Sequence, residues 1–210
     1  PSTTCGPGEC STDPACSFCL VGGKPLYWPR GCVSYSMQES GSKLRGIGAT
    51  TLQSYVTKAF ETWISAGCPG GGKPSVAIYD FGFVSCDAQE YNQDDGNANI
   101  WMFRDDDWPY IGVGTTLALT TLTFNVESGE IYDADVEINS FENPLTTTDA
   151  NVQADLESIV VHEAGHFLGL SHSCDPEATM FAAYQFGEIK LRTLEPDDIE
   201  GLCRIYPSGE

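Results

Sequence analysis

Apolar residues recur at helical spacing in the first third of the chain, at positions where every third or fourth residue is hydrophobic. The members of this stripe are Leu52, Val56, Phe60, Trp63 and Ile64. The spacing predicts a helix over residues 51–66. Thr50 and Gln53 offer a capping box at its start, and Gly67 is a suitable stop.

Two further helices are predicted in the second half of the chain. One covers residues about 151–168 and carries the chemistry discussed below. The other runs from Pro196 to about Tyr206. Proline suits a first helical turn, and Asp197 and Asp198 follow it where the helix dipole favours anions.

Segments that alternate between apolar and polar residues predict strands between these helices. They comprise residues 32–37, 76–81 and 99–103, then a hairpin of residues 122–126 and 132–138. Ser128 and Gly129 supply the hairpin turn. The order of strands and helices predicts an α/β (α+β) domain with a mixed sheet.

Cysteine is concentrated at the start of the chain. The nine cysteines are Cys5, Cys10, Cys16, Cys19, Cys32, Cys68, Cys86, Cys174 and Cys203. Four of them fall in residues 1–26, which we interpret as a Cys-rich appendage before a folded domain of residues 27–210. This density indicates an oxidising compartment and a secreted, extracellular protein. The odd cysteine must be free, bound to another chain or a metal ligand.

The chain is strongly acidic, with a formal net charge of −20. This charge disfavours nucleic acid as a partner, because phosphates require cations that the surface lacks. No apolar run is long enough to span a bilayer. Some acidic residues offer oxygen ligands for calcium, although a solvated acidic surface explains them equally well. They are Asp94, Asp95, Asp105, Asp106, Asp107, Asp133, Asp135 and Glu137.

The motif that carries chemistry begins at His162. His166 lies four residues later, so on a helix the two imidazoles stack on one face and can share a tetrahedral zinc ion. Gly169 permits the left-handed turn that ends the helix, and this turn can bring His172 back as a third ligand. The chain has only three histidines, and all three fall in this motif.

Three protein ligands leave a fourth coordination position for water, which is typical of a catalytic zinc site. Glu163 follows the first ligand and is placed to reach a water rather than the metal. We therefore expect one zinc ion as the cofactor and Glu163 as general base and then general acid in peptide hydrolysis.

The pattern HExxHxxGxxH followed by a methionine resembles the signature of the metzincin metalloproteases. Ser173 and the segment from Ala178 to Tyr184 resemble the matrixin branch, as does Leu194–Leu202. Residues 129–136 resemble secreted bacterial matrixin-like proteases. The resemblance extends over residues 27–207.

The resemblance implies a fold with an upper subdomain and a small lower one. The upper part would hold a twisted mixed sheet and two long helices, and the lower part the methionine turn and the C-terminal helix. Met180 would form the floor under the zinc ligands, and Phe181 and Tyr184 would line an apolar substrate pocket. An extended peptide would bind along an antiparallel edge strand within residues 115–122.

The chain departs from the family pattern in two respects. Ala182 stands where a proline usually follows the methionine, which affects the pocket wall. No histidine remains for the second, structural zinc of vertebrate matrixins. From element order we expect the disulfides Cys174–Cys203 and Cys68–Cys86.

Two other interpretations stay open alongside the enzyme. The chain can be a non-catalytic binding module on a metzincin scaffold, although the intact Glu163 argues against this. It can also be a latent precursor in which a cysteine in or beside the N-terminal appendage blocks the zinc. The enzyme is expected to act as a monomer on peptides or proteins.

Overall fold

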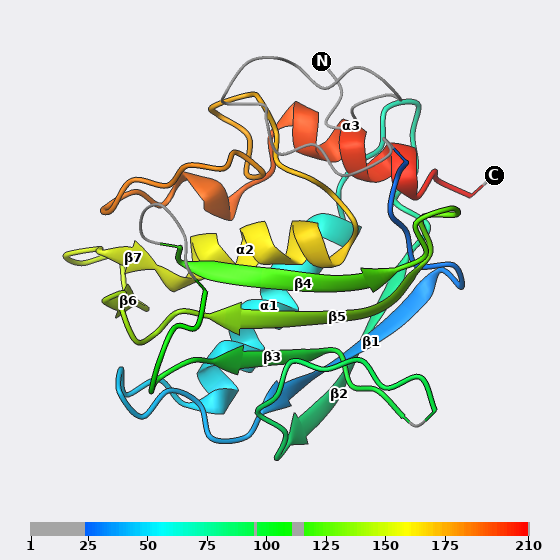
Figure 1. Ribbon diagram of the computed structural model, residues 1–210. Coiled ribbons are helices and arrows are strands. Elements are labelled where there is room, and N and C mark those ends of the chain that lie inside the picture. The colour runs from blue at the N-terminus through cyan, green and yellow to red at the C-terminus, as the bar shows by residue number, and fades with distance from the viewer. Residues whose placement is uncertain (1–23, 95, 111–115, 210) are drawn as a thin grey trace.

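A five-stranded sheet forms the centre of the computed structural model, which describes residues 24–94, 96–110 and 116–209. Its strands, in the spatial order β2-β1-β3-β5-β4, are β2 Ala77–Val84, β1 Cys32–Gln38, β3 Ile100–Phe103, β5 Ile131–Ile138 and β4 Ala118–Phe124 (Figure 1). The first four are parallel, and β4 runs antiparallel to β5 at one edge. The predicted mixed sheet is therefore confirmed.

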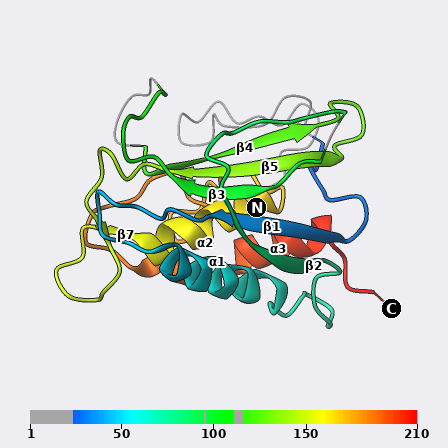
Figure 2. The same cartoon turned by 90° about the horizontal axis from the view of Figure 1, so that it is seen from below.

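Three α-helices accompany this sheet in the described residues: α1 Ala49–Ile64, α2 Leu156–Phe167 and α3 Pro196–Ile205. Figure 2 shows α1 and α2 on one face of the sheet. Trp63 from α1, Phe167 from α2 and Trp101 from β3 are fully buried in the core that joins these layers. The α/β class with two long helices on a mixed sheet is thus the observed architecture.

The predicted stripe of α1 is the buried face of that helix, and Leu52, Val56 and Trp63 have no exposed surface. The expected capping box is wrong. The helix begins after Gly48 with no side-chain cap, and Gln53 instead donates a hydrogen bond to Asp80 on β2.

The second helix begins later than predicted. Residues 145–146 and 154–155 pair as the short parallel strands β6 Leu145–Thr146 and β7 Ala154–Asp155, so the chain is still extended at residue 155. Asp155 then caps α2 by accepting a hydrogen bond from the Ser158 N–H at 2.9 Å. The first residue of α2, Leu156, therefore lies only six residues before His162.

The hairpin of β4 and β5 turns where the sequence predicted it. Gly129 has a φ of 84°, a left-handed conformation that glycine adopts without strain. Register shifts at Thr123 and Phe124, next to the turn. The hairpin places β4 at the edge of the sheet, in agreement with the antiparallel edge strand expected from the family.

The start of the described chain is anchored near the end of α2. Trp28 donates its indole N–H to the Phe167 carbonyl, and the Tyr206 hydroxyl bonds both the Trp28 N–H and the Leu168 carbonyl. Leu26 is also buried, so the core begins at or before this residue. The appendage expected over residues 1–26 lies almost wholly outside the described residues, and its boundary stays a prediction.

In the described part of the chain, no helix has both the length and the apolar character needed to cross a membrane.

Candidate metal centre and cleft

The three motif histidines converge at the end of α2. Their ring centroids lie 4.8 Å apart for His162 and His166, 4.7 Å for His166 and His172, and 5.3 Å for His162 and His172. One nitrogen from each lies within 4.8 Å of the others, as in a set of ligands around one ion. No other group of three candidate metal ligands forms in the described ranges.

Gly169 makes this convergence feasible. It has a φ of 97°, and a Cβ at this position would stand 2.3 Å from the Leu26 carbonyl oxygen. Glycine is therefore required both by the turn and by the close passage of the neighbouring backbone. The turn ends α2 and returns His172 toward the two helical histidines, as the spacing predicted.

Backbone carbonyls orient two of the imidazole rings. His162 Nδ1 lies 2.7 Å from the Thr179 carbonyl, and His166 Nδ1 lies 2.8 Å from the Leu170 carbonyl. A carbonyl can only accept, so each Nδ1 carries the proton and each Nε2 is left as a lone-pair donor. The rings are thus held in the tautomer that a metal needs.

The electrostatics of the site also favour neutral histidines. Burial lowers the pKa of His166 well below its usual value, and the neighbouring His162 and His172 lower it further. Burial, with a smaller contribution from His162, lowers the pKa of His172 to about 4. Neutral imidazoles in a three-nitrogen set are typical zinc ligands, so this chain's residues fit a catalytic zinc ion.

Met180 is fully buried, and its backbone is held from α3. The Asp198 carboxylate accepts hydrogen bonds from the N–H groups of Thr179 and Met180, at 2.8 and 3.0 Å. Because the Thr179 carbonyl orients His162, Asp198 connects α3 to a metal ligand through one short turn. The sequence identified Asp198 only as a helix-start residue, since its partners lie 18 and 19 residues away.

Glu163 is buried beside the metal centre, with 5% of its surface exposed. The Thr120 hydroxyl on β4 donates a hydrogen bond of 2.5 Å to Glu163 Oε2. Burial raises the pKa of Glu163, while His162 and the Thr120 hydroxyl act in the opposite direction. A carboxylate with a raised pKa next to a metal site is suited to accept and return a proton. Thr120 was not among the residues singled out from the sequence.

A cleft of about 890 Å³ lies over the histidines and along β4. Phe181 and Tyr184, expected to line a pocket, both line this cleft, and so does Ala182. The Tyr184 hydroxyl accepts a hydrogen bond from the Asp155 N–H at 2.9 Å and donates one to the Glu188 carbonyl at 2.7 Å. These bonds fix the ring between the start of α2 and the segment that precedes η2 Lys190–Arg192.

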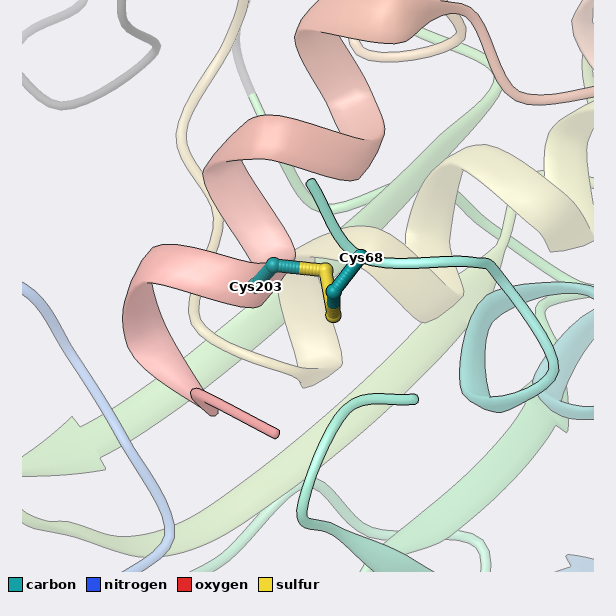
Figure 3. The surroundings of a disulfide bond; sticks show 2 residues. All are labelled: Cys68 and Cys203. Carbon is teal, nitrogen blue, oxygen red and sulfur yellow. A yellow bond between two sulfur atoms is a disulfide. The ribbon is translucent and has the colours of Figure 1, made fainter. Parts of the chain in front are cut away.

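Both predicted disulfides are wrong. Cys68 pairs instead with Cys203, and their Cα atoms lie 5.6 Å apart (Figure 3). The bond joins the loop after α1 to α3, segments 135 residues apart in the chain, which element order did not place together. Cys174 is disulfide-bonded, but not to Cys203, and Cys86 is a free thiol.

Cys32 is the other free thiol among the described cysteines, and it is exposed. It was one of five residues that the predicted pairing left for the odd cysteine. The other four, Cys5, Cys10, Cys16 and Cys19, lie outside the described residues, as does the segment invoked for latency.

Several acidic residues considered for calcium have protein partners. Asp105 accepts hydrogen bonds from the Ser42 and Ser140 hydroxyls, both at 2.6 Å. Asp135 accepts hydrogen bonds from the backbone N–H groups of Glu90 and Ile100. Glu137 pairs with Arg104 and Tyr110. These contacts give the three side chains partners within the protein, without an ion. Asp95 lies outside the described residues.

Comparison with known proteins gives one family. A model of the matrixin family matches residues 27–207. Human neutrophil collagenase is 28% identical over 201 residues, which cover 94% of this chain and 37% of the collagenase. Human matrix metalloproteinase-16 is 29% identical over 192 residues, with coverage of 90% and 28%.

A plant protein matches a shorter stretch more closely. Metalloendoproteinase 5-MMP of Arabidopsis thaliana is 46% identical over 70 residues, or 32% of this chain and 18% of its own length. The chain thus spans less than half the length of each of these relatives.

Proposed function

The chain belongs to the matrixin family, and we propose that it is a zinc-dependent endopeptidase that cleaves extended peptides with Glu163 as its general base and acid. The observation that carries this proposal is the convergence of His162, His166 and His172 beside the buried Glu163. Relatives named as metalloproteinases support the same activity.

The residues divide the work as follows. A bound zinc ion would supply the Lewis acidity that makes water nucleophilic and polarises the scissile carbonyl. Glu163 accepts the proton of the attacking water as the new carbon–oxygen bond forms. It then donates a proton to the amine nitrogen, and the bond between carbonyl carbon and nitrogen breaks. His162 and His166, oriented by the Thr179 and Leu170 carbonyls, would hold the ion together with His172. Water replaces the amine on the carbonyl, and no oxidant or other reactant is needed.

The substrate is proposed to bind along β4. This strand is antiparallel, lies at the edge of the sheet and lines the cleft with residues such as Leu119 and Thr120. A peptide that added to this edge would pass directly over the histidines, with its backbone held by strand pairing. Substrate recognition would then rest on main-chain hydrogen bonds and on one side-chain pocket.

We propose an apolar side chain immediately after the scissile bond. Phe181, Tyr184 and Leu191 line the cleft and are mainly hydrophobic. Ala182 replaces a bulkier wall residue, so the pocket should accept large apolar groups. A library of random peptides, mapped by mass spectrometry, would show this preference, and a preference for acidic or basic residues would contradict it.

Secretion is part of the proposal. The Cys68–Cys203 bond and the disulfide of Cys174 are stable in an oxidising compartment and rare in a reducing one. We expect the protein to act outside the cell, on peptide or protein substrates, as a monomer.

The central test compares two variants of the full chain. Glu163→Gln should keep zinc at the wild-type stoichiometry and lose most turnover, because the carboxylate is needed as a base and not as a ligand. His166→Ala should lose the metal. Both proteins are purified identically, so residual proteolysis common to them would reveal a contaminant. Near-normal kcat in Glu163→Gln, or a zinc-loaded wild type that stays inactive even after removal of residues 1–23, would refute the proposed function. An inactive wild type that becomes active on removal of residues 1–23 would instead support the latent precursor.

A further inference from the structure

The side chain of Thr120 reaches from the substrate-binding edge of the sheet to the carboxylate of Glu163. Thr120 lies in β4 and pairs with Val136 of β5, whose side chain is in the core. Its hydroxyl is 2.5 Å from Glu163 Oε2 and 3.4 Å from the Glu163 carbonyl. This contact joins residues 43 positions apart in the chain.

From this contact we infer that Thr120 is a positioning residue, which holds the Glu163 carboxylate in the orientation that proton transfer requires. The inference rests on the proposed function of Glu163 and adds a residue to it. No other hydrogen bond to the Glu163 carboxylate is found in the described part of the chain, so Thr120 alone fixes one of its two oxygens.

The bond has a direct geometrical consequence for the other oxygen. A glutamate has three side-chain torsions, and an unanchored carboxylate rotates freely about the last of them. With Oε2 held by a hydroxyl that donates, Oε1 is left to accept the proton of the attacking water. A hydroxyl bonded to a carboxylate is a strong, charge-assisted contact, which keeps the carboxylate in one orientation between turnovers.

The position of Thr120 also couples the base to the substrate. The strand that carries Thr120 is the one along which the peptide is proposed to pair, and Thr120 itself lines the cleft. Strand pairing fixes the scissile bond relative to β4, and the hydroxyl fixes the base relative to the same strand. The substrate and the Glu163 carboxylate are therefore both positioned by the same strand. This reduces the misalignment between them that would slow catalysis.

Three variants test this inference in the zinc-loaded, full chain. Thr120→Val removes the hydroxyl at nearly constant volume, Thr120→Ser keeps it, and Thr121→Val makes the same exchange at the next residue, whose side chain alternates to the opposite face of the strand. Thr120→Ala takes the place of the valine variant if that variant does not fold. Zinc content and Tm are measured for each variant before kinetics.

The expected result is a split between kcat and KM. Thr120→Val should lower kcat by about 10- to 100-fold, the scale reported for small misplacements of catalytic groups, with KM within about twofold of wild type. Thr120→Ser should restore kcat to within about threefold, and Thr121→Val should match wild type. A role limited to packing would lower Tm or raise KM, and serine, which lacks the methyl group, would not rescue it.

A double-mutant cycle isolates the pair. In Glu163→Gln the base is already absent, so adding Thr120→Val should reduce the residual turnover by less than about threefold, compared with the much larger loss expected in the wild-type background. Calorimetric binding of a substrate peptide to the two Gln variants should give equal affinities.

Outcomes that overturn the inference differ from those that overturn the proposed function. A wild type that stays inactive after removal of residues 1–23 refutes the endopeptidase itself. An active wild type with unchanged kcat in Thr120→Val refutes only the role of Thr120. The role of Thr120 is also refuted if Thr120→Val and Thr120→Ser lower kcat equally. The same holds if Thr120→Val lowers the turnover of Glu163→Gln as much as it lowers that of the wild type.

Discussion

The sulfur of Met180 lies against the backbone of α2 at Gly165, so closely that a Cβ on Gly165 would stand 2.3 Å from it. The same Cβ would stand 2.7 Å from the ring of Trp63. The helix that carries two metal ligands therefore rests directly on the methionine turn and on α1. The φ of Gly165 does not lie in the left-handed region, so the backbone conformation does not require glycine here. The close packing against Met180 and Trp63 does.

Gly165→Ala should consequently destabilise the protein and disturb the metal centre. Forcing a methyl group into a filled core costs about 1–3 kcal/mol of unfolding free energy. Because the displaced elements carry His162, His166 and the turn after His172, zinc affinity should fall as well. Urea unfolding and competition with a zinc chelator measure the two effects.

The matched control is Gly67→Ala, where a Cβ would meet nothing within 4 Å. This control should change neither the unfolding free energy nor zinc affinity. A Gly165→Ala protein as stable as the control would mean that Met180 moves aside at little cost, which would contradict a rigid floor under the ligands.

The Cys68–Cys203 disulfide should contribute substantially to stability. Its loop of 135 residues is long, and removing a native disulfide from a small secreted domain costs about 2–5 kcal/mol. The double variant Cys68→Ser/Cys203→Ser should therefore unfold at lower urea concentration. Cys86→Ser, which alters a free thiol, should leave the urea midpoint unchanged. Equal midpoints for the double variant and wild type would show that α3 docks without the bond.

Local pattern was sufficient to predict the elements and the ligands, because both depend on residues close in the chain. The stripe from Leu52 to Trp63 predicts α1, and the spacing of His162, His166 and His172 predicts the metal centre. The hairpin turn at Gly129 and the helix end at Gly169 depend on backbone conformations that the residue itself favours.

Contacts between distant segments were not predicted, for a physical reason. The Cys68–Cys203 pair, the bond from Thr120 to Glu163 and those from Asp198 to the methionine turn each depend on how elements dock. Local patterns in a single sequence do not reveal how the elements dock. The late start of α2 has the same origin, since β6 and β7 keep the preceding residues extended.

Arg192 and Asp155 form an ion pair, and removal of Arg192 alone should lower the free energy of unfolding. Arg192 donates two hydrogen bonds to the Asp155 carboxylate, at 2.7 and 2.8 Å, and the side chain of Asp155 is 1% exposed. Arg192→Ala would leave that carboxylate buried without its cation, a loss of about 3–5 kcal/mol. Lys190→Ala, two residues away and more exposed, should cost less than about 1 kcal/mol.

This pair also supports the wall of the cleft. The N–H of Asp155 donates to the Tyr184 hydroxyl, so movement of Asp155 would release the tyrosine ring. Arg192→Ala should therefore raise KM for peptides with a large apolar side chain after the scissile bond. Unchanged stability and KM in Arg192→Ala would contradict this prediction. It would mean that the Asp155 carboxylate forms other contacts or becomes protonated when Arg192 is absent.

Asp133 should make the protein less stable as pH rises. It is fully buried in β5, and neither carboxylate oxygen has a hydrogen-bond partner among the residues that the structure describes. Burial, with the nearby charge of Asp135, raises the pKa of Asp133 to about 7. The folded state therefore binds a proton that the unfolded chain, with an aspartate pKa near 4, has already lost. Stability from this group is present below about pH 4 and is lost as pH rises from about 4 to about 7.

Asp133→Asn should remove this penalty, because the amide has no charge to bury. The variant should gain up to a few kcal/mol at pH 8, since each pKa unit corresponds to about 1.4 kcal/mol, and should gain little at pH 4.5. Asp107→Asn is the matched control at an exposed position, where the substitution removes no buried charge. The measurement is urea unfolding of the three proteins at each pH, with and without added calcium. A gain that is the same at both pH values would contradict a buried, protonated Asp133. If calcium stabilised the wild type but not Asp133→Asn at pH 8, the carboxylate would be ionised and held by the cation. That result would also contradict a buried, protonated Asp133.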